Sequence, residues 1–153
     1  MSGMSREQQL LDQVKTLMRV MLISERMPAE HRHPIKFNPL DFHTLGMVRT
    51  VPGVRAGTVV AALGIAPTTA SSVIGRLITR GLIQRRQCVE DRRAYELYLT
   101  DEGQEVADAI FRQDLSNMKL FLSALTAKEQ DQMLRLLDKV VTKVEAVEQA
   151  ASG

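Results

Sequence analysis

Residues 58–81 read TVVAALGIAPTTASSVIGRLITRG. The spacing of the apolar residues predicts a short helix over about 56–63 and a second helix that begins at Pro67 and ends before Gly81. Residues 64–66 supply the tight turn between them. Two helices joined in this way are typical of a helix-turn-helix.

The second of these helices has two chemically different sides. Its apolar stripe predicts a buried face and consists of Ala70, Val73, Ile74 and Leu77. The opposite side is rich in small hydroxyls and ends in an arginine, a composition that lets a helix lie close to base edges and phosphates in a major groove. The residues predicted to contact DNA from this helix are Thr68, Thr69, Ser71, Ser72 and Arg76.

Two strand-like runs follow Gly81, over 82–88 and 94–99, and the charged segment 89–93 (VEDRR) lies between them. Gly81 itself stands where a left-handed residue ends a helix at least cost. A hairpin with a charged tip after a helix-turn-helix predicts a winged helix. The predicted fold is therefore mainly α, with a small β-hairpin wing.

Three segments of this region, taken in order and spacing, resemble the MarR-type winged-helix regulators. They are RLITRGLI at 76–83, EDRR at 90–93 and LTDEG at 99–103. The resemblance implies a homodimeric transcription regulator of double-stranded DNA, most often a repressor, that reads a pseudo-palindromic operator. In the wing it implies that Asp91 pairs with Arg92 or Arg93 to hold the turn while the other arginine reaches the minor groove. The sequence does not say which.

Charge is distributed unevenly along the 153 residues, although the net charge is only +2. Residues 76–93 hold six arginines against two acids, whereas residues 101–153 hold six basic and ten acidic residues. Positive charge gathered on one lobe favours a polyanionic partner. The single cysteine and the lack of a long apolar run predict a soluble, cytoplasmic protein with no membrane partner.

We interpret residues 1–153 as one MarR-like domain with three parts. Residues 1–37 hold an N-terminal helix, over about 6–27, and a loop; residues 38–100 form the winged helix-turn-helix DNA-binding lobe; residues 101–153 form two long helices. Apolar stripes on the terminal helices are longer than a lone helix pair can bury, although such stripes more often belong to a core. Their length and the resemblance favour dimerisation through the first and third parts.

A possible effector site is predicted from Met18, Met21, His43 and Met47. Methionines at helical spacing more often form a soft core, but they also line adaptable pockets. The hypothesis is that a small aromatic or amphipathic ligand binds between the first two helices and the winged lobe.

Other chemistry finds little support, and the sequence predicts neither an enzyme nor a cofactor or metal site. It contains no phosphate-binding loop, dinucleotide fingerprint, zinc-protease motif or nucleophile elbow. His31 and His33 lack further matched ligands and are interpreted as polar loop residues, and Cys88 as an inert strand residue. The alternatives that stay open are a metal- or redox-responsive regulator and a winged helix that docks onto an acidic protein surface.

Overall fold

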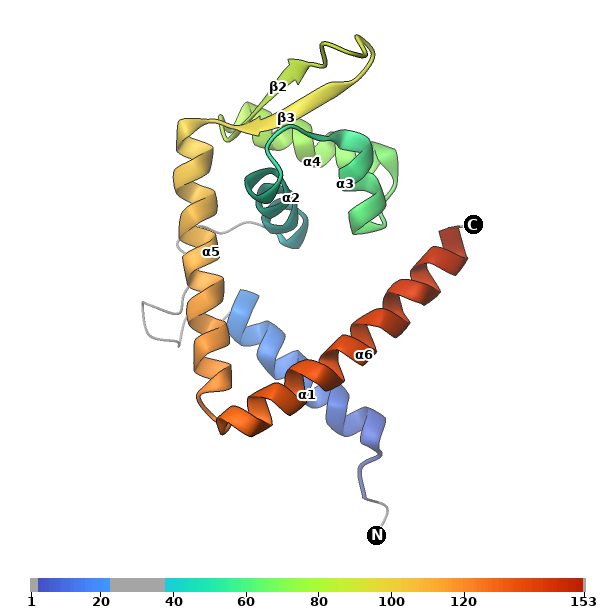
Figure 1. The fold of residues 1–153 in the computed structure, drawn as a ribbon, viewed down its shortest axis with the longest axis vertical. Coiled ribbons are helices and arrows are strands. Elements are labelled where there is room, and N and C mark those ends of the chain that lie inside the picture. The colour runs from blue at the N-terminus through green and yellow to red at the C-terminus, as the bar shows by residue number, and fades with distance from the viewer. Residues whose placement is uncertain (1–2, 23–37, 153) are drawn as a thin grey trace. The chain divides into compact units, whose positions relative to one another are not determined.

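The computed structural model describes residues 3–22 and 38–152 (Figure 1). The chain divides into two compact units, Met1–Ser116 and Asn117–Gly153, with the boundary inside α5. In chain order the elements are α1 (Arg6–Leu22), α2 (Pro39–Thr50), β1 (Val54–Arg55), α3 (Ala56–Leu63), α4 (Pro67–Thr79), β2 (Ile83–Gln87), β3 (Tyr95–Leu99), α5 (Asp101–Leu122) and α6 (Ala127–Ser152). The mainly helical winged-helix fold expected from the sequence is confirmed.

The wing is part of a three-stranded antiparallel sheet in the order β1-β3-β2. The hairpin register pairs Ile83 with Leu99 and Gln87 with Tyr95, while Val54 of β1 pairs with Leu97. The strand β1 was not predicted, because two residues are too short to show an alternating pattern. It places Arg55 beside the wing.

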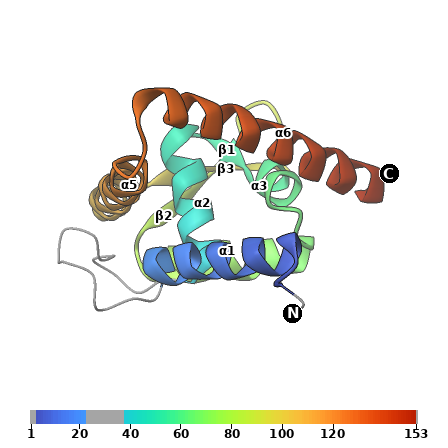
Figure 2. The ribbon, with the colours of Figure 1, turned by 90° about the horizontal axis from the view of Figure 1, so that it is seen from below.

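The core of the first unit lies between α2, α3, α4 and the sheet. The predicted apolar stripe of α4 is fully buried, as its helical spacing requires. Leu77 of α4, Val59 of α3 and Leu97 of β3 are among the most deeply buried side chains. α2 contacts α3, α4 and β3, and Figure 2 shows α2 and α3 from below. The outer face of α4 is thereby left on the surface.

Both turns that flank α4 depend on glycine. Gly64 ends α3 with φ 63°, and Gly81 follows α4 with φ 76°, a backbone region that other residues enter at a cost. Pro67 occupies the first position of α4, where its missing N–H costs nothing. These local signals explain why the helix bounds could be predicted closely.

A tight junction connects the wing to α5. Thr100 Oγ1 accepts a hydrogen bond from the Gly103 N–H at 3.0 Å and donates one to the Gly81 carbonyl at 2.6 Å. A side chain at position 103 has no room, because its Cβ would lie 1.9 Å from the Leu82 carbonyl oxygen. The LTDEG segment is therefore a packing motif that fixes the start of α5.

The helix α1 begins at Arg6 as predicted, and neither α1 nor α6 buries a residue. Capping boxes formed by Ser5 with Gln8 and by Thr126 with Glu129 begin α1 and α6. Residues 23–27, over which the first helix was expected to continue, lie outside the described residues. Over 3–22 and 38–152 no single helix meets the length and apolarity that a membrane span requires; only α3 and α4 together do, and they are bent by 119°.

Candidate nucleic-acid interface

The hydroxyl-bearing residues predicted to contact DNA share the surface-facing side of α4. Thr68, Ser71 and Ser72 are exposed, and Thr69 is half-buried. Ala70 and Val73, which alternate with them, point into the core. The side of α4 that could enter a groove is therefore small and uncharged over its first two turns.

Arg76 belongs to the same exposed helix but has a partner within the protein. Its Nη2 lies 2.5 Å from Oδ1 of Asp41 on α2. Asp41 also completes the capping box of α2, since its N–H donates to Asn38 Oδ1 at 2.9 Å. Asp41 lies in the first turn of α2, and nothing in the local sequence pattern connects it with a residue 35 positions later.

The wing turn is held by Asp91 through a backbone contact. Asp91 Oδ1 accepts a hydrogen bond from the Arg93 N–H at 3.0 Å, and its carbonyl accepts one from the Ala94 N–H. The expected partner was an arginine side chain, whereas the contact in the structure involves the Arg93 amide. The side chains of Arg92 and Arg93 are both exposed.

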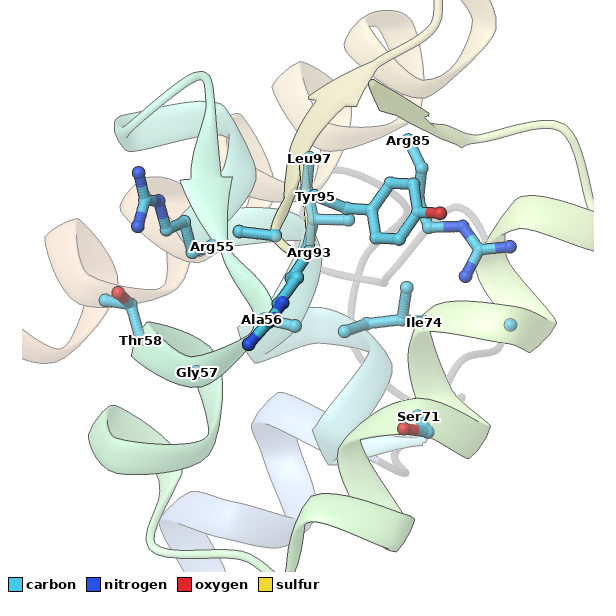
Figure 3. A pocket seen from close by; sticks show the side chains of 12 residues that line it. Arg55, Ala56, Gly57, Thr58, Ser71, Ile74, Arg85, Arg93, Tyr95 and Leu97 are labelled. Atoms are coloured by element: carbon cyan, nitrogen blue, oxygen red, sulfur yellow. The ribbon is translucent and has the colours of Figure 1, made fainter. Parts of the chain in front are cut away.

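Between α4 and the wing lies an open pocket of about 610 Å³. Ser71 lines it from α4, and Arg55, Arg85 and Arg93 line it from β1, β2 and the wing turn. Figure 3 shows the Arg93 side chain extending toward Ala56. Three arginines line this opening, and their positive charge makes it attractive to a phosphate chain. Sequence reasoning missed Arg55, because β1 carries no periodic signal.

Aromatic rings and a thiol hold several of these arginines in place. Arg85 lies over the Tyr95 ring at 5.3 Å and Arg86 over the Tyr98 ring at 4.3 Å, measured to the ring centroids. Arg55 Nη2 lies 3.3 Å from Cys88 Sγ. Cys88 is buried and follows directly after β2. The arginines of this surface are thus partly ordered before any ligand arrives.

Tyr98 and Glu96 form a polar pair on β3. The Tyr98 hydroxyl donates to Glu96 Oε2 at 2.8 Å. This hydrogen bond, with smaller contributions from desolvation and the Glu96 charge, raises the pKa of Tyr98 above its ordinary value of 10.0. Tyr98 therefore stays a neutral donor, and the local positive charge comes from the arginines.

The four residues predicted for an effector site line one pocket. Met18 and Met21 of α1 and His43 and Met47 of α2 surround a space of about 690 Å³. Phe42 contributes to the same largely apolar wall. The arrangement could accept a small apolar or aromatic molecule.

The histidine pair considered for a metal, His31 and His33, lies outside the described residues. Over 3–22 and 38–152 no group of three or more His, Cys, Asp or Glu side chains is arranged to hold a metal ion.

Comparison with known proteins assigns the chain to one family. A family model described as the MarR family matches residues 35–94. The transcriptional repressor MprA of Escherichia coli K12 is 32% identical over 88 residues, which cover 58% of this chain and 50% of MprA. The chain therefore matches about half the length of that relative. YkoM of Bacillus subtilis, an HTH-type transcriptional regulator, is 30% identical over 103 residues, or 67% of each chain.

Solved structures agree at the level of the fold. FabT of Streptococcus pneumoniae, determined in complex with DNA, superposes with a TM-score of 0.79 at 18% identity, and the match covers 92% of this chain and 99% of FabT. These structures show the winged-helix fold, and the family model together with MprA and YkoM places the chain in the class of proteins that regulate transcription. The chain belongs to the MarR family, whose members are DNA-binding regulators and not enzymes.

Proposed function

We propose that this protein is a homodimeric, ligand-responsive repressor that binds a pseudo-palindromic operator in double-stranded DNA in the cytoplasm. The observation that carries the proposal is the hydroxyl-rich outer face of α4 beside the arginine-lined pocket and the wing. A surface of this kind combines base readers with phosphate contacts. MprA is itself named a repressor, which supports the same direction of regulation here.

In this proposal α4 lies in the major groove. Thr68, Thr69, Ser71 and Ser72 hydrogen-bond to base edges or phosphates, and Gly75 lets the helix approach closely because no side chain stands there. The wing follows the adjacent minor groove with Arg92 and Arg93, since narrow A·T-rich grooves attract arginine. Residues 38–100 would then supply the whole DNA-binding surface.

Dimerisation is supported by the apolar side chains that the single chain leaves in solvent. Seven of them share α6, and each exposes about half of its surface: Leu134, Leu136, Leu137, Val140, Val141, Val144 and Val147. α1 likewise exposes Leu10, Leu11, Val14 and Leu17. Apolar surface of this extent is typical of an interface. We assign dimerisation to residues 1–37 and 101–153, so that two copies of α4 reach successive major grooves.

Regulation is proposed to act through the pocket lined by Met18, Met21, His43 and Met47. A small aromatic ligand can change DNA affinity only if it binds one arrangement of the dimer more tightly than another. Titrating phenolic carboxylates into the protein–DNA complex tests this. Binding to the pocket without any change in operator affinity would contradict ligand-responsive repression.

The DNA-binding proposal is tested by footprinting the purified protein on the intergenic DNA upstream of its own gene, followed by fluorescence anisotropy on the protected site. The double variant Ser71→Ala/Ser72→Ala should weaken specific binding by about 30-fold, because each of the two lost hydrogen bonds contributes roughly 1 kcal/mol. Thr142→Ala on α6 removes an exposed hydroxyl elsewhere and should change nothing. Equal affinities for all three proteins, or a wild type that protects no site, would contradict the proposal.

A further inference from the structure

The guanidinium of Arg76 forms an ion pair within the protein. Although Arg76 stands on the exposed side of α4 and its side chain is 41% exposed, its Nη2 lies 2.5 Å from Asp41 Oδ1. The Asp41 side chain is only 4% exposed. An ion pair with one partner buried is much less open to exchange than a pair in which both partners are solvated.

Asp41 is itself fixed by its place in α2. Its Oδ2 accepts a hydrogen bond from the Asn38 N–H at 3.4 Å while Oδ1 receives Arg76, so both carboxylate oxygens have partners. If Arg76 moved to a DNA phosphate, the buried carboxylate would lose its cation, which is strongly unfavourable. The pair therefore resists competition from phosphate.

We propose that Asp41 is a positioning residue, which holds the Arg76 guanidinium against α2 and so keeps its charge away from the DNA backbone. The inference rests on the proposed binding of DNA through α4, and it reassigns Arg76 from a DNA contact to an internal anchor. The outer face of α4 then contacts DNA through the neutral hydroxyls of Thr68, Ser71 and Ser72. Phosphate contacts strengthen binding to every sequence alike, so withholding one lowers the affinity for the operator and for unrelated DNA by the same factor.

The test measures how binding depends on salt, for the footprinted operator and for an unrelated duplex of equal length. Each phosphate contact contributes about 0.9 to the slope of log affinity against log salt. Asp41→Asn releases Arg76 and should steepen the slope on both duplexes by about 0.9, with a severalfold gain in affinity at low salt. Asp41→Asn/Arg76→Gln should return both slopes to the wild-type value.

Two further proteins make the result decisive. Arg76→Gln alone should leave the wild-type slope unchanged, while Arg92→Gln/Arg93→Gln in the wing should reduce it, which shows that the assay detects a lost phosphate contact. Thermal melting by circular dichroism identifies any variant that does not fold. If Asp41→Asn fails in this way, the double variant, which replaces both charges with amides, still reports whether Arg76 contributes to the slope.

The two proposals fail differently. A drop of about 0.9 in slope for Arg76→Gln or for the double variant, with wild type binding its operator, overturns the positioning role of Asp41 and leaves the DNA-binding function intact. Absence of any salt-dependent DNA binding by wild type overturns both.

Discussion

Gly103 shows how one residue can be dictated by its surroundings. A Cβ at this position would lie 1.9 Å from the Leu82 carbonyl oxygen, which belongs to backbone and cannot rotate away. Gly75, also inside a helix, has no atom within 4 Å of the place where a Cβ would stand. The two glycines therefore respond in opposite ways to the same substitution.

We predict that Gly103→Ala lowers the free energy of unfolding by about 2 kcal/mol, because the start of α5 must shift away from Leu82. Gly75→Ala should instead raise it by up to about 1 kcal/mol, since alanine favours a helix interior. Urea unfolding followed by circular dichroism measures both. Equal effects of the two substitutions would show that the contact at position 103 is absent in solution.

Asp91 provides a second test at this scale. Asp91→Ala removes the acceptor for the Arg93 N–H and should loosen the wing turn, so that operator affinity falls severalfold while the melting temperature stays nearly constant. Asp91→Asn keeps a side-chain oxygen and should retain most of the affinity. Anisotropy titrations distinguish them. Loss of affinity in both variants to the same degree would mean that the negative charge matters more than the turn.

At the level of the element, α2 and α5 are joined by a polar and aromatic contact. Arg49 Nε lies 2.8 Å from Asp108 Oδ1, Gln104 Nε2 donates to the same oxygen, and the Arg49 guanidinium lies 4.1 Å from the Phe111 ring centroid. The hydrogen bonds from Arg49 and then Gln104 hold the pKa of Asp108 below its ordinary value of 3.8. A lowered carboxyl pKa stabilises the fold only while the group is ionised.

The stabilisation by Asp108 should therefore be complete above pH 3.8 and decline as the pH falls through the lower pKa of the folded state. Asp108→Asn should be less stable than wild type at neutral pH, and the two unfolding curves should converge in acid. Glu105→Gln, on an exposed position of the same helix, serves as the control and should show no such convergence. A stability difference for Asp108→Asn that did not depend on pH would contradict this account.

Elements whose signals are local could be predicted from sequence. Glycine and proline signals predicted the bounds of α3 and α4, and hydrophobic spacing identified the buried side of α4. The strand β1 could not be predicted, because its two residues pair with β3 only through the fold. The same holds for the contacts of Asp41 with Arg76 and of Arg55 with Cys88, which join distant residues and leave no mark on local periodicity.

At the scale of the whole molecule, the proposed dimer predicts that DNA affinity depends on α6. Leu137→Glu/Val141→Glu places two charges on the exposed apolar side of α6 and should give a monomer in sedimentation analysis. Operator affinity should fall by roughly 100-fold or more, because binding of the second half-site is no longer intramolecular. Gln132→Glu adds a charge to α6 and should leave the dimer intact. A variant that stayed dimeric would show that the interface lies elsewhere.

The junction at Thr100 and Gly103 has a mechanical consequence. Thr100 donates hydrogen bonds to the carbonyls of Gly81 and Leu82, and Gly103 packs directly against Leu82. The first turn of α5 therefore cannot move relative to the segment that follows α4. A rotation of α5 therefore moves the hairpin with it. In the proposed dimer, any bending that separates the two DNA-reading lobes must therefore be absorbed farther along α5.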